Sequence, residues 1–301
     1  MKKKVILLLC FVFFLSCEKQ DSSDSEITEY EWTTKQFVFD HDGLSRSYIL
    51  HKPLDFVENS PLLFVLHGFG SSATTIMTYS QMNTLADENG FMVCYPQGST
   101  LDTGQTHWNA NLEMSNINDI DFLSKLAKQI QSNYKINPEN TFTSGMSNGG
   151  FMSYTLGCEK ADIFKAIASI TGTMSGKDWK NCNPSQKIPA LQISGTNDTT
   201  VPWDGTMSTA WGWGGAPHIQ KVMDFWADLN STTKTEKIDF PDIESSDKST
   251  ASLTKRTDGI NGNEVWFYTI SGGGHDWPGS WGNKDISASQ EIWKFFNKHL
   301  K

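Results

Sequence analysis

The stretch Gly145-Met146-Ser147-Asn148-Gly149 decides the fold, because it places a serine between two glycines at the junction of two unlike segments. A short β-prone run, 141–144, precedes it, and a segment with helical character, 151–159, follows it. Strand, serine and helix in this order are the setting of a nucleophile elbow, a sharp turn that exposes the serine hydroxyl above a sheet. Glycines are needed beside the serine because Cβ atoms there would collide with the backbone. The stretch predicts Ser147 as a nucleophile.

Short apolar or β-prone runs alternate with helical segments along most of the chain, which is typical of a mostly parallel sheet. The chain opens differently, with two alternating runs joined by the turn 40–43, which predicts an antiparallel hairpin. We therefore expect a single α/β domain over residues 32–301, with an antiparallel N-terminal hairpin and helices on both faces of the sheet. The expected strands are 35–39, 45–51, 62–66, 91–95, 141–144, 166–170, 190–193 and 265–270, and the expected helices are 75–88, 120–134, 151–159, 218–229 and 287–300.

Two segments do not fit this alternation. Residues 239–258 are polar and irregular, and we interpret them as a long surface excursion. Residues 203–218 carry three tryptophans among glycines, a composition that favours a flexible aromatic flap over a core helix.

The composition limits the classes of partner. The 301 residues carry a formal net charge of -9. A nucleic-acid surface requires a basic patch, and no Lys/Arg cluster occurs beyond residues 2–4. We therefore expect no nucleic-acid partner, and we expect a monomer.

The N-terminus has the order of a secretory signal. Residues 2–4 form a basic start, and the apolar run 5–15 is too short to span a bilayer. Leu15-Ser16-Cys17 closes the signal, residues 1–17, and resembles a bacterial lipobox with acylation of Cys17; an ordinary signal peptide with an incidental cysteine is the alternative. Residues 18–31 are rich in Ser, Asp and Glu, which predicts a disordered tether. We expect an exported protein that is lipid-anchored to a bacterial membrane or cell surface, or else periplasmic or extracellular.

Three cysteines remain for the exported domain. Cys94 lies within the apolar run 91–95, so we expect a buried and inert thiol. Cys158 ends the helix that follows the elbow, and Cys182 lies in a loop of Trp, Asn and Pro residues. An oxidising compartment favours disulfides, and we hypothesise a bond between Cys158 and Cys182.

A serine hydroxyl is a poor nucleophile at neutral pH, so Ser147 requires a histidine base and a carboxylate that orients the base. Asp198 follows the expected strand 190–193 in a tight polar loop and is the candidate acid; the alternative is that Asp198 only caps the turn and Asp204 acts instead. His275 follows the last expected strand behind three glycines, which free its loop to reach Ser147. His275 is the candidate base.

Acyl transfer also requires hydrogen-bond donors for the oxyanion. One is the backbone N–H of Asn148, directly after the nucleophile. The other is expected from a loop after an early strand, and Leu66-His67-Gly68-Phe69-Gly70 occupies that place. Phe69 N–H is the candidate donor, and a simple glycine turn is the alternative.

Related motifs are spread over most of the chain. They are His67-Gly68-Phe69-Gly70, Ala86-Asp87, Tyr95-Pro96-Gln97-Gly98, Trp108-Asn109, Gly145-Met146-Ser147-Asn148-Gly149-Gly150, Gly195-Thr196-Asn197-Asp198 and Gly273-Gly274-His275-Asp276-Trp277-Pro278-Gly279. From about Arg46 to the C-terminus, the chain resembles the polyhydroxybutyrate depolymerase and feruloyl esterase type of secreted α/β-hydrolase, which is similar to carbohydrate esterase family one. The resemblance implies Ser147, Asp198 and His275 as a triad, and it also suggests the pairing of Cys158 with Cys182.

The substrate is not fixed by this resemblance. Members of the family remove hydroxycinnamoyl or acetyl groups from plant polysaccharides, or cut polyester chains and their oligomers. The chain departs from the simpler members in its segment 203–213, where tryptophans gather. A tryptophan face can stack on a sugar or a feruloyl ring, and packing within loops is the alternative. The tryptophans expected to contact substrate are Trp108, Trp203, Trp211, Trp213 and Trp277.

These features predict a serine carboxylesterase that acts through an acyl-enzyme, most simply on feruloyl or acetyl esters of plant-type polysaccharides. One alternative is a depolymerase for hydroxyalkanoate oligomers or polyesters, and another is an inactive carbohydrate-binding lipoprotein. We expect no metal and no cofactor, because the sequence has no Cys/His cluster with metal-ligand spacing and no phosphate-binding glycine loop.

Overall fold

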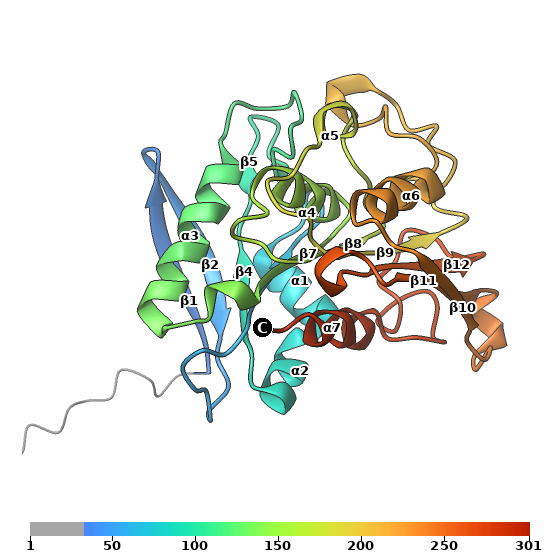
Figure 1. Ribbon diagram of the computed structural model, residues 1–301. Helices are drawn as coiled ribbons and strands as arrows, with labels where there is room; N and C mark the ends of the chain where they lie inside the picture. Colours follow the sequence, from blue (N-terminus) through green and yellow to red (C-terminus); the bar gives the residue numbers. More distant parts are fainter. Residues whose placement is uncertain (1–32) are drawn as a thin grey trace, which may run out of the picture. The chain divides into compact units, whose positions relative to one another are not determined.

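A mixed sheet of ten strands forms the centre of the computed structural model, which describes residues 33–301 (Figure 1). The strand order is β1-β2-β4-β3-β7-β8-β9-β12-β11-β10, and β5 and β6 pair separately. The strands are β1 (Thr34–His41), β2 (Leu44–His51), β3 (Leu62–Leu66), β4 (Met92–Pro96), β5 (Ser99–Thr100), β6 (Thr106–His107), β7 (Thr141–Met146), β8 (Ile167–Ile170), β9 (Ala190–Gly195), β10 (Lys234–Asp239), β11 (Thr250–Thr257) and β12 (Val265–Ser271). The α-helices are α1 (Ala73–Ser80), α2 (Met82–Asn89), α3 (Asp119–Tyr134), α4 (Asn148–Glu159), α5 (Gly176–Asn181), α6 (Ile219–Leu229) and α7 (Ala288–Lys298).

The six central strands, from β4 to β12 in the sheet order, are all parallel. The hairpin of β1 and β2 joins one edge by antiparallel pairing with β4. Strands buried on both faces have continuous apolar sequences, and β3 is an example, with all five residues buried. The expected single α/β domain, with a mostly parallel sheet and an antiparallel N-terminal hairpin, is confirmed.

Helices cover both faces of the sheet (Figure 1). On one face α1, α2 and α7 contribute to a core that contains Ile76, Met82 and Phe296. On the other face α3 and α4 pack around Phe122 and Phe151, and α6 adjoins α4 through ring contact of Trp226 with Tyr154. The amphipathic patterns of the sequence therefore predict where these helices lie. The expected helix 75–88 is an exception, because it consists of two helices, α1 and α2.

The break in that helix lies at Gln81. This residue has a φ of 52°, in the left-handed region, so it ends α1 and begins α2 in a new direction. Neither glycine nor proline marks the site, and the helical periodicity continues across it, which is why the sequence predicts one helix.

The interpretation of residues 239–258 as a surface excursion is wrong for the second half of that stretch. Thr250–Thr257 form β11, which pairs with β12 on one side and with β10 on the other. Only Ala251 and Leu253 of β11 are fully buried, and β10 is almost entirely exposed. An edge hairpin with so few buried positions has little apolar alternation, so its pairing depends on the neighbouring strand.

The signal segment 1–17, its Cys17 and the tether 18–31 lie outside the described residues. Between residues 33 and 301, no helix combines the length and the apolar character that a bilayer crossing requires.

Candidate active site

Ser147 occupies a sharp turn between β7 and α4. Its φ of 53° and ψ of -119° are unusual for a residue other than glycine, and such strain is found at functional sites. The turn packs tightly on the backbone of β3. A Cβ atom on Gly149 would lie 2.3 Å from Leu66 O, and one on Gly145 would lie 2.4 Å from the carbonyl group of Gly149. The two glycines of the pentapeptide are therefore required by the packing, as an elbow demands.

Asp198 and His275 form a hydrogen-bonded pair. His275 Nδ1 lies 2.7 Å from Asp198 Oδ2, and the side chain of Asp198 is 1% exposed. The other carboxylate oxygen of Asp198 accepts the N–H groups of Thr200 and Val201, each at 2.8 Å. A carboxylate with this many donors has a single orientation, so Asp198 can hold the imidazole of His275 in one orientation.

The loops that carry the pair are bound to each other. Asn197 N–H donates to Gly273 O at 2.8 Å, and a Cβ atom on Gly195 would lie 2.3 Å from the same oxygen. Because β9 and β12 are adjacent and parallel, the loops that follow them leave the sheet side by side. This juxtaposition brings residues 198 and 275 together although they are 77 positions apart.

All three candidate triad residues follow the carboxyl ends of parallel strands. Ser147 follows β7, Asp198 follows β9 and His275 follows β12, and β8 is the single strand between β7 and β9. These ends lie at one edge of an open α/β sheet, which is where such sheets bind ligands. The alternative acid, Asp204, is exposed and accepts hydrogen bonds from Thr206, which lower its pKa.

The candidate oxyanion donors lie on either side of the elbow. Asn148 is the first residue of α4, so its N–H has no acceptor within the helix. Gly68 approaches Ser147 closely, because a Cβ atom on Gly68 would lie 3.5 Å from Ser147 Cβ. Among residues 33–301, Phe69 N–H donates no hydrogen bond. The loop that contains Phe69 therefore adjoins the nucleophile with a free amide, as an oxyanion hole requires.

The side chain of Asn148 fixes the loop that contains Trp108. Asn148 Oδ1 accepts Trp108 N–H at 2.7 Å, and Asn148 Nδ2 donates to Trp108 O at 3.0 Å. Trp108 Nε1 donates to His67 O, and both side chains are fully buried. The expectation that Trp108 contacts substrate is wrong, because its ring supports the loop of residues 66–70 from inside the molecule.

His67 is a structural histidine in this network. Its Nδ1 donates to Gly68 O at 2.7 Å, and its Nε2 accepts Gly98 N–H at 2.9 Å. Burial lowers the pKa of His67 to about 4, so the ring is neutral near pH 7. The sequence predicts no separate structural role for His67. The position of His67 directly before Gly68 is the feature that could have indicated this role.

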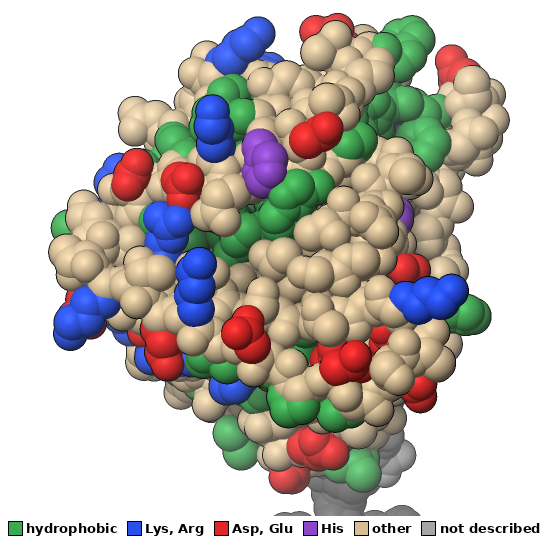
Figure 2. All heavy atoms as spheres, turned by 90° about the vertical axis from the view of Figure 1, so that its right-hand side faces the viewer, with side chains coloured by type: hydrophobic (Ala, Val, Ile, Leu, Met, Phe, Trp, Pro, Cys, Tyr) green, Lys and Arg blue, Asp and Glu red, His purple; other side chains and the backbone are tan. Residues whose placement is uncertain are grey.

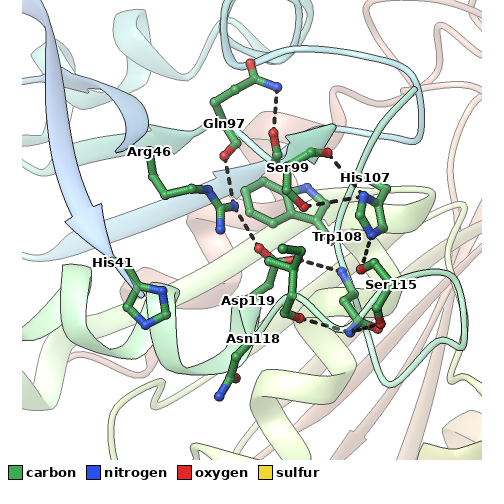
Figure 3. Close-up of polar contacts among 12 residues, drawn as sticks. His41, Arg46, Gln97, Ser99, His107, Trp108, Ser115, Asn118 and Asp119 are labelled. Atoms are coloured by element: carbon green, nitrogen blue, oxygen red, sulfur yellow. Dashed lines mark hydrogen bonds and ion pairs between the residues drawn. The ribbon is translucent and has the colours of Figure 1, made fainter. Parts of the chain in front are cut away.

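A buried ion pair of Arg46 and Asp119 lies beside the loop that contains Trp108 (Figure 3). Arg46 of β2 lies 2.7 Å from Asp119 Oδ1 and also donates to Gln97 O. The second oxygen of Asp119 accepts Asn109 N–H at 2.7 Å, directly beside Trp108. In Figure 3 the side chains of Arg46 and Asp119 point toward each other beside Trp108. No local sequence pattern relates positions 46 and 119, so the sequence does not predict this ion pair.

The remaining tryptophans divide into three environments. Trp277 is 1% exposed and donates to Ser289 Oγ at 3.0 Å, so the expectation of substrate contact is wrong for Trp277 as well. Trp203 is half-buried and stacks on Phe267 at 5.3 Å. The ring of Trp213 meets Phe69 at 6.1 Å and Phe151 at 5.1 Å, both edge-on. Trp211 remains exposed.

A surface depression of about 530 Å³ adjoins the acid. It is lined by Asn197, Asp198, Trp203 and Thr206, among others. The face shown in Figure 2 is hollowed, with hydrophobic side chains in the hollow and charged groups of both signs scattered around it. An ester with an apolar acyl group fits such surroundings better than a highly charged ligand.

Cys158 and Cys182 form a disulfide, as expected. The bond joins the end of α4 to the residue after α5, so it fixes α5 against the helix that follows the nucleophile. Cys94 is a free, buried thiol, and burial raises its pKa.

One group of metal-ligating side chains occurs within residues 33–301, namely His41, Asp42 and Asp121. It lies on the hairpin and on α3, and Lys125 Nζ already lies 2.7 Å from Asp121 Oδ2. A cation on this carboxylate opposes a metal ion at the same place.

Comparisons with known proteins agree with this architecture. A family model described as esterase PHB depolymerase matches residues 46–186. NocK of Nocardia uniformis subsp. tsuyamanensis, which is named an esterase, is 27% identical and covers 79% of this chain and 72% of its own length. Feruloyl esterase B of Piromyces equi is 28% identical over 76% of this chain, and feruloyl esterase C of Emericella nidulans is 28% identical over 55%. The chain spans 42% and 59% of the length of those two relatives.

Among solved structures, the acetyl xylan esterase from Aspergillus awamori superposes with a TM-score of 0.62. The match covers 88% of this chain and 99% of that structure at 14% sequence identity, so it shows the fold alone. The fold, the matched family model and the relatives agree. Together they support an α/β-hydrolase esterase of the polyhydroxybutyrate depolymerase and feruloyl esterase type.

Proposed function

We propose that this protein is a serine carboxylesterase that removes feruloyl or acetyl groups from plant-type polysaccharides through an acyl-enzyme. The main support for this proposal is the hydrogen bond between His275 and Asp198. It lies at the carboxyl ends of the parallel strands, where Ser147 occupies its strained turn. A histidine base held by a buried carboxylate is the arrangement that activates a serine hydroxyl as a nucleophile.

In the proposed reaction, His275 removes the hydroxyl proton of Ser147 as Oγ attacks the ester carbonyl carbon. The N–H groups of Phe69 and Asn148 donate to the oxyanion, and Asp198 stabilises the imidazolium. His275 then protonates the departing alcohol as the carbon–oxygen bond breaks. A water molecule, deprotonated by the same histidine, attacks the acyl-enzyme and releases the acid and Ser147. No step requires a cofactor.

The names of the relatives favour esters of plant polysaccharides. Two relatives of this chain are named feruloyl esterases, and a third is named a bifunctional acetylxylan esterase and xylanase, of Neocallimastix patriciarum. Trp203 lines the depression beside Asp198, Trp213 contacts Phe69, and Trp211 is exposed. These rings offer surfaces for a sugar or a feruloyl ring.

A depolymerase for hydroxyalkanoate oligomers or polyesters is the second candidate function. The description of the matched family model favours it, and the same triad and oxyanion donors would perform the reaction. The two candidates differ in the groups that surround the ester, so substrate preference separates them.

We further propose that the protein is exported and held at a membrane by a lipid on Cys17, with residues 18–31 as a tether and the esterase domain acting as a monomer. The order of a basic start, an apolar run and a cysteine supports this part of the proposal. Metabolic labelling with a fatty-acid probe, with Cys17→Ser as the control, tests it; equal labelling of both proteins would refute the anchor.

Product release from a panel of four esters tests the proposed activity. The panel contains methyl ferulate, a feruloylated xylan oligosaccharide, acetylated xylan and a hydroxybutyrate trimer, each with the unaltered protein and with Ser147→Ala. Turnover of the first three that Ser147→Ala abolishes supports the proposal. Preference for the hydroxybutyrate trimer would instead support polyester breakdown as the function. Equal activity of Ser147→Ala and the unaltered protein would refute the triad.

A further inference from the structure

The loop after β8 lies between the strands that carry the nucleophile and the acid. β8 pairs with β7 on one side and with β9 on the other (Figure 1). Ser147 follows β7 and Asp198 follows β9, and the loop of residues 171–175 leaves the sheet between them. All five residues of this loop are buried. The loop therefore packs inside the molecule at the same sheet edge as the candidate triad.

Thr171 turns the chain at the end of β8 with a strained backbone. Its φ of 49° lies in the left-handed region, where a β-branched residue is a clear outlier. Thr171 is 2% exposed, its N–H donates to Ile193 O of β9 at 2.8 Å, and its hydroxyl donates to Ile170 O. Strain of this kind persists only where surrounding contacts maintain it, and it is concentrated at functional sites. The fold therefore maintains an unfavourable turn one strand away from the nucleophile.

The turn brings Gly172 against the backbone of the elbow. A Cβ atom on Gly172 would lie 2.8 Å from Ser147 O, 2.7 Å from Ser169 Oγ and 2.9 Å from the carbonyl carbon of Gly150. Contacts this short would force the neighbouring atoms to move, so glycine is required here. Directly before the turn, Ile170 O accepts Ser147 N–H at 2.8 Å. The segment after β8 thus contacts both backbone groups of Ser147, the amide through a hydrogen bond and the carbonyl through close packing.

A buried glutamine fixes the position of Gly172. Gln192 Nε2 of β9 donates to Gly172 O at 2.9 Å, and Gln192 Oε1 accepts the hydroxyl of Tyr154 at 2.7 Å. Gln192 and Tyr154 are both 0% exposed, and Tyr154 belongs to α4, the helix that begins directly after Ser147. Because a buried polar group without a partner is costly, this network favours one position of Gly172 relative to β9 and α4.

We propose that the turn of Thr171 and Gly172 positions the nucleophile, with Gly172 as the positioning residue. Ile170 O and Gly172 hold the amide and the carbonyl of Ser147, and these two contacts fix the direction of the Ser147 side chain. The strain at Thr171 is maintained because it places Gly172 in this contact. The inference rests on the proposed role of Ser147 as the nucleophile and holds for any ester substrate.

Gly172→Ala tests the contact with the smallest side chain. The measured quantity is kcat for p-nitrophenyl acetate per serine that a fluorophosphonate labels, so that unfolded protein does not lower it. This kcat should fall by about thirtyfold, because small displacements of a catalytic group cost up to about a hundredfold in rate. KM should stay within about twofold. The pH midpoint of kcat/KM should not change, because His275 and Asp198 retain their hydrogen bond.

Gly157→Ala is the matched control. Gly157 is also buried, in α4, but a Cβ atom there would meet side-chain atoms, Ile167 Cδ1 at 3.0 Å and Trp226 Cη2 at 3.2 Å, and no elbow backbone. Gly157→Ala should keep kcat within about twofold, even if its thermal midpoint changes. A loss as large as that of Gly172→Ala would make the effect a general result of crowding and overturn the inference.

The double variant Ser169→Ala/Gly172→Ala separates the two contacts of the added Cβ atom. It removes the contact with Ser169 Oγ, which has no hydrogen-bond partner in the described part of the chain, and retains the contact with Ser147 O. Its kcat should remain as low as that of Gly172→Ala. Recovery of the parent kcat would place the effect in β8 and overturn the inference.

Gln192→Leu loosens Gly172 without adding bulk, and it tests the inference even if Gly172→Ala does not fold. Loss of the Nε2 donor should lower kcat per labelled serine by about tenfold. Asn230→Leu removes another fully buried amide, which donates to Ile188 O at 2.9 Å before the amino end of β9. This control should keep kcat within about twofold. Equal kcat of the two leucine variants would overturn the inference.

Failure of this inference and failure of the proposed function give different results. A parent protein that hydrolyses p-nitrophenyl acetate through Ser147, with Gly172→Ala and Gln192→Leu at the parent kcat, overturns the inference and leaves the function intact. A loss confined to KM would make the turn a substrate-binding element and also overturn it. A parent protein that neither takes the fluorophosphonate label nor hydrolyses the ester removes the proposed nucleophile, and this inference with it.

Discussion

Asp198 Oδ2 lies 2.7 Å from His275 Nδ1, while its other oxygen accepts two backbone N–H groups of its own loop. The carboxylate therefore has two tasks, because it closes the turn after β9 and orients the imidazole. The sequence left open whether Asp198 capped the turn or acted as the acid, and the structure shows the contacts of both roles in one side chain.

Asp198→Asn should lower kcat by about three to four orders of magnitude, because the amide can donate to His275 and favour the wrong tautomer. The turn should persist, since the amide oxygen can still accept both N–H groups. Steady-state kinetics on methyl ferulate, with circular dichroism as a check on folding, measures this. Asp204→Asn is the matched control and should keep kcat; a reversal of the two results would identify Asp204 as the acid.

We expect Trp213 to position the loop of Phe69, because its ring contacts both Phe69, the candidate oxyanion donor, and Phe151 of α4. Trp213→Ala should lower kcat by about tenfold, since small displacement of a donor weakens stabilisation of the transition state. KM for methyl ferulate should change little, and Trp213→Phe should restore most of the rate. A variant that raises KM at constant kcat would instead make Trp213 a substrate contact.

The buried pair of Arg46 and Asp119 should contribute strongly to stability. Arg46→Met leaves the Asp119 carboxylate buried with the N–H of Asn109 but without its cation, which should lower the free energy of unfolding by about 3–5 kcal/mol. Urea unfolding followed by fluorescence measures this change. Lys234→Met, which removes an exposed ion pair with Asp258, should have little effect. Equal effects of the two substitutions would contradict a buried, poorly solvated pair.

Stability should fall in acid because two histidines, the buried His67 and the partly buried His299, are neutral in the folded protein. Burial lowers the pKa of His67 and of His299 to about 4, below the ordinary value of 6.5. Between pH 6.5 and pH 4 the unfolded chain binds more protons, so the free energy of unfolding rises with pH in this window. Each histidine contributes on the order of 3 kcal/mol that is present above pH 6.5 and is lost as the pH falls to 4.

The variant His299→Phe isolates one of these contributions. The ring of His299 contacts Phe295, and its Nε2 has no hydrogen-bond partner in the described part of the chain, so phenylalanine should fit. The dependence of the free energy of unfolding on pH between 4 and 6.5 should decrease by about one proton. An unchanged slope would show that His299 is protonated in the folded state.

The sequence was most informative where function depends on local chain geometry. The elbow requires glycines on both sides of Ser147, and the order of serine, acid and histidine follows from the order of the strands that carry them. The parallel sheet follows from apolar runs that alternate with amphipathic helices, because each element must bury one face. These features depend on neighbouring residues. The structure has the parallel sheet, the sharp turn at Ser147 and the hydrogen-bonded pair of Asp198 and His275 where the sequence predicts them.

The tertiary structure alone determined which tryptophans are exposed and which residues distant in the sequence stabilise each other. Trp108 and Trp277 belong to loops, yet other segments bury them, whereas Trp211 of the same residue type stays in solvent. The hairpin of β10 and β11 has too few buried apolar residues for its sequence pattern to predict two strands. It forms because β12 provides a free strand edge with which β11 pairs. The pairing of Arg46 with Asp119 joins positions 73 residues apart. Sequence by itself determined the chemistry that this chain can carry, because that chemistry depends on residue type and order. Only the folded chain determined which aromatic rings are buried and which are exposed, because burial depends on every segment that packs around them.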